Sequence, residues 1–217
     1  MGLNPFLSFL INNSQLILGD FLGFVASFGL QIIMDCLAKP DLNIKIGEIG
    51  DGQRDGKPKH RFLQVMVENK KSKILSRRIA FSCRAKLIYR GKQKELLMLD
   101  GRWSSKKQPI AQTVVENKLV AVPDLPNIYI ISKEDLPPGA INASQIAVGL
   151  KHDGEPGFYG FNDVSYGFDD WKNPSSLIKQ KECEVEIVVY SSDHSWAKKF
   201  KILNPSSNID DFELTNA

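Results

Sequence analysis

Residues 79–90 read IAFSCRAKLIYR, and every second residue from Ile79 to Tyr89 is apolar. The residues between them include Ser82, Arg84 and Lys86, which are polar. Since successive side chains of a β-strand point to opposite faces, this alternation predicts a strand with one buried and one solvent-facing side. Strands of this kind are typical of antiparallel sheets.

The same two-residue period recurs along most of the chain. It is seen in residues 42–46, 63–68 and 182–189, and a last strand is expected around residues 196–202. Turn-forming pairs such as Asp51-Gly52 and Asn204-Pro205 separate these runs. About eight or nine strands between residues 40 and 205 favour a mainly β fold, a two-sheet antiparallel sandwich, although a small barrel has a similar pattern.

The first part of the chain has a different composition. Residues 1–38 contain no Lys or Arg and only two acids, Asp20 and Asp35, whereas all 28 basic residues follow. Residues 16–37 are largely apolar, and Pro40 should end a helix there. We therefore expect three parts: a hydrophobic, transmembrane helix in residues 1–39, a β-sandwich in 40–205 and a flexible tail in 206–217.

A membrane-spanning helix is the first of three interpretations of this segment. Its uncharged part, residues 21–34, would be about 21 Å long, so a span of roughly 30 Å must also include Asp20. Small and polar side chains share one stripe of the helix and could pack against a second copy of it. The stripe contains Gly19, Asp20, Gly23, Ser27 and Gln31. The alternatives are a helix lying among lipid headgroups and a helix packed on the body.

The charges that follow the helix predict its orientation in a membrane. Lys39, Lys45, Arg54 and Lys57 come directly after it, and no basic residue precedes it. Because loops rich in Lys and Arg stay on the cytoplasmic side, we expect a single-pass protein with a cytoplasmic-facing body.

Residues 60–91, HRFLQVMVENKKSKILSRRIAFSCRAKLIYRG, contain a strand ending in Val-Glu-Asn, a short polar connection and a long alternating strand. This arrangement resembles the start of immunoglobulin-like sandwiches of the CARDB type, although Lys70-Lys71 stands where a glycine-containing turn is usual. With DLPPG at 135–139, DDWKNP at 169–174 and FKILNPSS at 200–207, the chain is similar to uncharacterised archaeal and bacterial proteins that carry such a domain after a membrane helix. The resemblance implies a fold and a layout, and no chemistry.

A basic band in residues 70–94 contains ten Lys or Arg residues and no acid. Arg84, Lys86 and Arg90 should share the outward face of one strand, where they could contact anionic lipid headgroups. Nucleic acid is a less suitable partner, because the band lacks the interleaved aromatic residues of single-strand binders. The alternative is a solvent-facing strand surface balanced by acids of the same domain.

Residues 152–171, HDGEPGFYGFNDVSYGFDDW, combine aromatic and acidic side chains. Exposed aromatic rings stack on sugars, and carboxylates bind cations, so this segment could form a carbohydrate- or ion-binding site, although the carboxylate spacing matches no calcium loop. The candidate ligand-binding residues are Tyr159, Tyr166, Asp169, Asp170 and Trp171. The alternative is a core strand followed by a hairpin in which Trp171 closes one end of the sandwich.

The remaining reactive residues point to no chemistry. Cys83 and Cys183 both fall on apolar strand faces, so we expect them in the core, either as neighbouring reduced thiols or as a disulfide. The three histidines are far apart in the sequence, and no catalytic, phosphate-binding or dinucleotide motif occurs. We therefore expect a non-catalytic interaction or structural module without a cofactor or bound metal.

Overall fold

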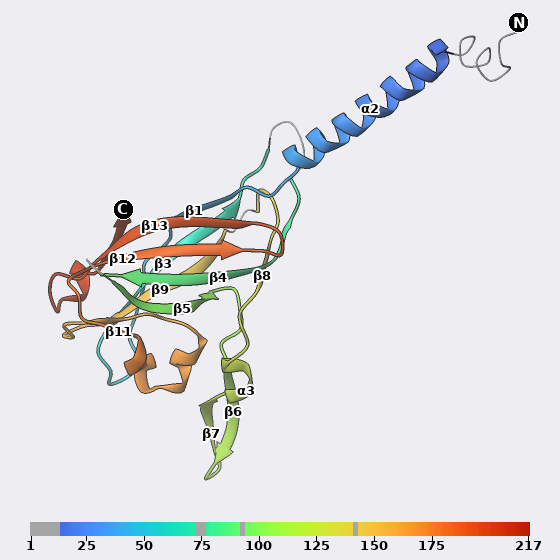
Figure 1. Cartoon of the computed structure of the whole chain (residues 1–217). Helices are drawn as coiled ribbons and strands as arrows, with labels where there is room; N and C mark the ends of the chain where they lie inside the picture. Colours follow the sequence, from blue (N-terminus) through green and yellow to red (C-terminus); the bar gives the residue numbers. More distant parts are fainter. Residues whose placement is uncertain (1–13, 73–76, 92–93, 141–142) are drawn as a thin grey trace, which may run out of the picture.

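The computed structural model describes residues 14–72, 77–91, 94–140 and 143–217 and is mainly β (Figure 1). Its strands are β1 (Leu42–Ile46), β2 (Gly50–Gly52), β3 (His60–Asn69), β4 (Ala80–Arg90), β5 (Glu95–Trp103), β6 (Ile110–Val115), β7 (Lys118–Pro123), β8 (Glu134–Leu136), β9 (Ser144–His152), β10 (Phe158–Tyr159), β11 (Leu177–Ile178), β12 (Glu182–Tyr190), β13 (Ser195–Leu203) and β14 (Glu213–Asn216). Its helices are α2 (Ser14–Leu37) and α3 (Leu125–Ile128), with 3₁₀ helices η1 (Asp163–Gly167), η2 (Asp169–Trp171), η3 (Pro174–Ser176) and η4 (Ile209–Asp211).

Twelve strands form one large antiparallel sheet. Eight of them follow one another in the order β1-β3-β9-β5-β4-β12-β13-β14, and the other four, the short strands β2, β8, β10 and β11, pair with members of this series. Strand β5 links two halves of this sheet, one containing β1, β3 and β9 and the other containing β4, β12, β13 and β14. The first residues of β5 pair with β4, while Arg102 and Trp103 pair with β9. Gly101 lies where β5 changes partner, and a Cβ atom there would be 2.8 Å from the Cβ of Ala85. Only glycine lets the strands approach this closely.

The core lies between the inward faces of these two halves. Alternation in β4 is confirmed from Cys83 to Tyr89, since Cys83, Ala85, Leu87 and Tyr89 are fully buried. They pack in one cluster with inward side chains of neighbouring strands. That cluster includes Leu63, Val65, Val67, Ile146, Val148, Val185, Ile187, Val189, Phe200 and Ile202.

The prediction that Ile79 and Phe81 share this inward face is wrong. They are 39% and 59% exposed, and Ala80 is buried in their place. The backbone of Ser82 has a φ of 49°, and the pairing of β4 with β8 shifts register between Ala80 and Cys83. An irregularity of this kind moves every preceding side chain to the other face of the strand.

The prediction of a flexible tail in residues 206–217 is also wrong. Strand β14 pairs with β13 from Phe200 to Leu203, and it adds an edge strand to the large sheet. Phe212 is fully buried and lies 5.3 Å, centroid to centroid, from the ring of Phe158. The segment was predicted to be flexible because it is acidic, but two of its residues, Phe212 and Leu214, are apolar and pack into the core.

Two elements project from this body. Figure 1 shows helix α2 extending away from the sheet near the start of β1, and the β6–β7 hairpin extending in another direction. Strands β6 and β7 form a separate two-stranded sheet. Among the residues that the structure describes, no helix is both long and apolar enough to cross a membrane.

Candidate functional site

Helix α2 presents apolar side chains to its surroundings along its described length. Phe24, Phe28 and Leu30 are each at least 60% exposed, and Gly23 has nothing within 4 Å of the position of a Cβ atom. The predicted packing residues Gly23, Ser27 and Gln31 are exposed on this helix. Gly19 and Asp20 lie outside the residues whose side chains the structure describes.

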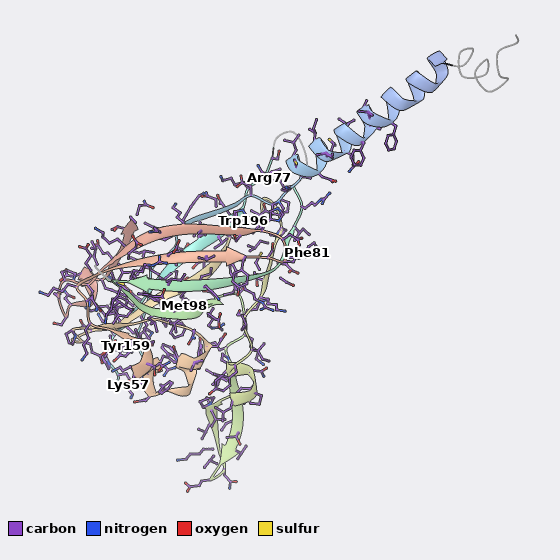
Figure 2. The ribbon with its side chains drawn as sticks, viewed as in Figure 1. Lys57, Arg77, Phe81, Met98, Tyr159 and Trp196 are labelled. Atoms are coloured by element: carbon purple, nitrogen blue, oxygen red, sulfur yellow. The ribbon has the colours of Figure 1, made fainter. Side chains whose placement is uncertain are left out.

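The end of α2 is fixed to the start of β4 by charged and backbone contacts. Asp35 and Arg78 form an ion pair, and the Arg78 backbone N–H donates to the carbonyl of Ala38 at 2.7 Å. Arg77 donates to the carbonyl of Lys39 at 3.3 Å and lies 3.4 Å from the carboxylate of Asp41. Figure 2 shows Arg77 and Phe81 at this end of the molecule.

Sequence reasoning missed these contacts. It counted Asp35 as one of the two acids in residues 1–38 and assigned Arg77 and Arg78 to the basic band. The only sequence feature that could have indicated these ion pairs is opposite charge. Because the chain contains many acids and bases, charge alone does not identify which of them pair.

The predicted basic face exists on β4, and acids from β12 lie beside its Arg90 end. Arg84, Lys86 and Arg90 all lie on the outward, half-exposed face. Arg90 pairs with Glu186 at 2.5 Å and lies 3.9 Å from Glu184. These contacts hold the pKa of the Arg90 guanidinium above its ordinary value. The Glu residues of β12 thus place carboxylates beside Arg90, whereas Lys86 and Arg84 stand opposite Val188 and Tyr190.

Most aromatic residues of segment 152–171 pack into the protein, whereas Phe168 is 40% exposed. Tyr159 and Phe161 are buried in a second apolar cluster, with Tyr166 and Trp171 packed against it. The Trp171 ring lies 5.2 Å from His60, edge to face. Sequence reasoning named Tyr159, Tyr166 and Trp171 as candidate ligand-binding residues and missed the β3 side chains that cover them.

Charged side chains complete this cluster. The Arg54 guanidinium lies 3.9 Å above the Trp171 ring, on a face that a sugar would use for stacking. Lys57 lies 3.1 Å from both Asp169 and Asp170, and its hydrogen bonds lower the pKa of the exposed Asp169. Figure 2 shows Lys57 and Tyr159 at the end of the body far from α2. No group of three metal-ligating side chains converges anywhere in the described parts of the chain.

His60 and His152 face each other across β3 and β9, with ring centroids 5.9 Å apart. Their pairing was not predicted from their separation in sequence. Burial lowers the pKa of both imidazoles, and His152 is 2% exposed. Neither ring nitrogen of His152 has a hydrogen-bond partner among the described side chains and backbone.

Cys83 and Cys183 are both buried, as their strand positions predict, and both are free thiols. The hypothesis that they are neighbours is wrong. Cys183 lies beside Arg90 at the far end of β4, with its Sγ 3.5 Å from the Arg90 carbonyl. The antiparallel register therefore separates the two thiols by nearly the length of β4, about 25 Å.

Comparison with known proteins adds no constraint on the site. No family model, curated protein or solved structure matches this chain.

Proposed function

We propose that this protein is a non-catalytic interaction module that helix α2 tethers to a lipid bilayer. The observation that carries the proposal is the distribution of exposed apolar side chains around α2. Phe24, Val25, Leu30 and Ile33 are all at least 50% exposed. At 100° per residue these positions point in different directions around the helix axis.

Apolar side chains on every side distinguish α2 from a helix that packs on its own body. A surface helix needs one apolar stripe, whereas a helix that is apolar all round requires an apolar environment on all sides. The described part of the body does not supply that environment, because the large apolar side chains of α2 from Phe24 to Leu37 are at least 38% exposed. Lipid acyl chains satisfy this requirement.

Cations gather where α2 meets the body. The group comprises Lys39, Lys70, Lys71, Arg77 and Arg78, with Asp35 and Asp41 as the acids among them. We call this group the basic collar. Basic residues beside an apolar segment are attracted to anionic headgroups by about 1 kcal/mol each. The collar therefore supports a position of the body at the membrane surface. It also supports the cytoplasmic side for the body, because loops rich in Lys and Arg stay on that side.

Flotation of the full chain with neutral phosphatidylcholine vesicles tests the tether. The wild-type chain should float with the vesicles, whereas Phe28→Lys/Ile32→Lys should stay in the dense fraction. Each central lysine opposes insertion by about 3 kcal/mol.

A matched control places the same two changes elsewhere. Met98 and Leu177 are exposed apolar residues outside α2, so Met98→Lys/Leu177→Lys should still float. A wild-type chain that remains below the vesicles contradicts the tether. In that case oligomers in the dense fraction would indicate that α2 packs against other copies.

In this proposal, the body that α2 tethers is an immunoglobulin-like sandwich. Its support is the change of partner in β5, which lets strands β3 and β9 face β4 and β12 across one apolar core. Such a body presents strand faces and loops for contact with a partner. The outward charges of β4 and the loops at its far end are the surfaces that remain available to that partner.

A further inference from the structure

The β6–β7 hairpin exposes apolar side chains on both of its faces. Val114 and Leu119 pair across the hairpin and are 64% and 67% exposed. Val115 and Val120 lie on the opposite face and are 50% and 39% exposed. An isolated two-stranded hairpin is only marginally stable in water, and three or more strands are needed to bury such surfaces.

One edge of β7 is open and can be assigned from the hydrogen bonds of the hairpin. The Asp124 N–H donates to the carbonyl of Pro109, at the start of β6, at 2.9 Å. Because successive residues of a strand direct their backbone groups to opposite sides, those of Leu119, Ala121 and Pro123 face away from β6. Strand β7 has no second neighbour among the described strands.

The sequence along this open edge is complementary to itself when one copy runs antiparallel to another. Residues 118–124 read KLVAVPD, with Ala121 at the centre. Pairing Ala121 with Ala121 of a second copy places Val120 opposite Val122. It also places Lys118 opposite Asp124, once on each side of a two-fold axis.

We propose that β7 is a dimerisation edge that pairs antiparallel with β7 of a second copy of this chain, centred on Ala121. The product is a four-stranded sheet, β6-β7-β7-β6, with two Lys118–Asp124 pairs. Directly opposite charges and β-branched residues both stabilise antiparallel strand pairs. Pro123 offers no N–H, so Leu119 donates to the Pro123 carbonyl without a reciprocal bond.

This charge complementarity is what selects a second copy as the partner. Lipid would cover the apolar faces but would leave the backbone groups of the open edge without hydrogen bonds. A second β7 satisfies the edge, the apolar residues and both charges together. The β6 edge offers a competing self-pairing, and the experiments distinguish it by changes placed on the β6 side.

Sedimentation velocity of the full chain in detergent tests the proposal through charge reversal. The wild-type chain should show a monomer–dimer equilibrium. Lys118→Asp places two carboxylates together at each end of the paired strands, and Asp124→Lys places two ammonium groups together there. Each variant should weaken dimerisation by about tenfold or more.

Mixing the two variants supplies the control for any local effect of either change. In a mixed dimer, the carboxylates of one variant stand opposite the ammonium groups of the other at both ends of the paired strands, so an equimolar mixture should recover the dimerisation that neither variant shows alone. The double variant Lys118→Asp/Asp124→Lys restores an opposite-charge pair at both ends, and it should dimerise as the wild type does. Lys107→Asp, a matched reversal on the β6 side, should leave dimerisation unchanged.

A cysteine at the symmetry axis tests the register directly. In a Cys36→Ser background, Ala121→Cys should form an intermolecular disulfide on mild oxidation, because paired Cα atoms about 5.5 Å apart suit that bond. Val114→Cys, on β6, should not. A monomeric wild-type chain, a double variant that fails to recover, or sensitivity to Lys107→Asp would each overturn the proposal.

Discussion

At the scale of single residues, several buried polar groups hold distant segments together. Lys151 of β9 is fully buried, and its ammonium group donates to the side chain of Asn204 and to the carbonyl of Ser206 at 2.5 Å. Burial lowers the pKa of this lysine. Nothing in the alternation of β9 distinguishes such a lysine from a solvent-facing one, because the distinction depends on the segment that covers it.

The His60–His152 pair should make the fold sensitive to acid. Burial lowers both pKa values in the folded state, so the unfolded chain binds protons more readily. The stability due to neutral imidazoles is complete above the unfolded pKa of about 6.5 and is lost as pH falls toward the folded values. We expect denaturant unfolding at pH 7.5 and pH 5 to show a smaller difference for His152→Leu than for the wild type.

His194 provides the matched comparison for this prediction. Its ring stacks on Trp196 and lies away from the histidine pair, so His194→Leu should keep the wild-type difference between the two pH values. Equal pH dependence in the wild type and His152→Leu would rule out this role for His152.

The thiols of Cys83 and Cys183 should not react with thiol reagents in the folded protein. Burial raises the pKa of Cys83 and of Cys183 to about 11, whereas Cys36 is exposed. Because the thiolate is the reactive form, a maleimide should label one cysteine in the native chain and three after denaturation. Rapid native labelling of Cys83 or Cys183 would show that the core opens there. Comparing Cys36→Ser with the wild type identifies the native site.

At the scale of elements, sequence periodicity predicted the strands better than it predicted their neighbours. The strands β1, β3, β4, β12 and β13 follow the expected alternation because one face of each is buried. The irregularity at Ser82 left no sequence signal, so Phe81 was assigned to the wrong face. The separation of Cys83 from Cys183 depends on antiparallel register, which a single strand does not encode.

The C-terminal segment should contribute strongly to stability. Phe212 is fully buried against Phe158, so Phe212→Ala should lower the free energy of unfolding by about 3–5 kcal/mol. Tryptophan fluorescence during urea unfolding measures the change. Leu177→Ala removes a partly exposed side chain and should have a much smaller effect. A loss below about 1 kcal/mol for Phe212→Ala would mean that the segment is loosely held, as its composition first indicated.

At the scale of the whole molecule, much of the exposed apolar surface lies on two projections, α2 and the β6–β7 hairpin, and on residues 125–131 that follow the hairpin. The sequence predicted a distinct apolar helix from composition, but it did not predict the hairpin or the loop cluster around Trp171. Both depend on long-range packing: β3 covers Trp171, whereas no described strand covers the open edge of β7. The candidate helix residues could therefore be selected from sequence, and the projecting hairpin could not.

The position of the cations relative to α2 predicts which of them meet anionic lipid. Lys70 and Lys71 belong to the basic collar, whereas Arg84 and Lys86 lie further along β4. Lys70→Glu/Lys71→Glu should therefore weaken binding of the full chain to phosphatidylserine-containing vesicles more than Arg84→Glu/Lys86→Glu does. Vesicle flotation at low salt measures the difference. Equal weakening by both pairs would place the outward face of β4 at the membrane as well.

The pairing of β14 with β13 has a consequence for biosynthesis. Because α2 precedes the body in the chain, it leaves the ribosome well before β14 and Phe212, which complete the sheet, have been made. The apolar helix is thus available to a targeting factor long before the body can close. During that interval the nascent strands, with their exposed edges, are the species most in need of a chaperone.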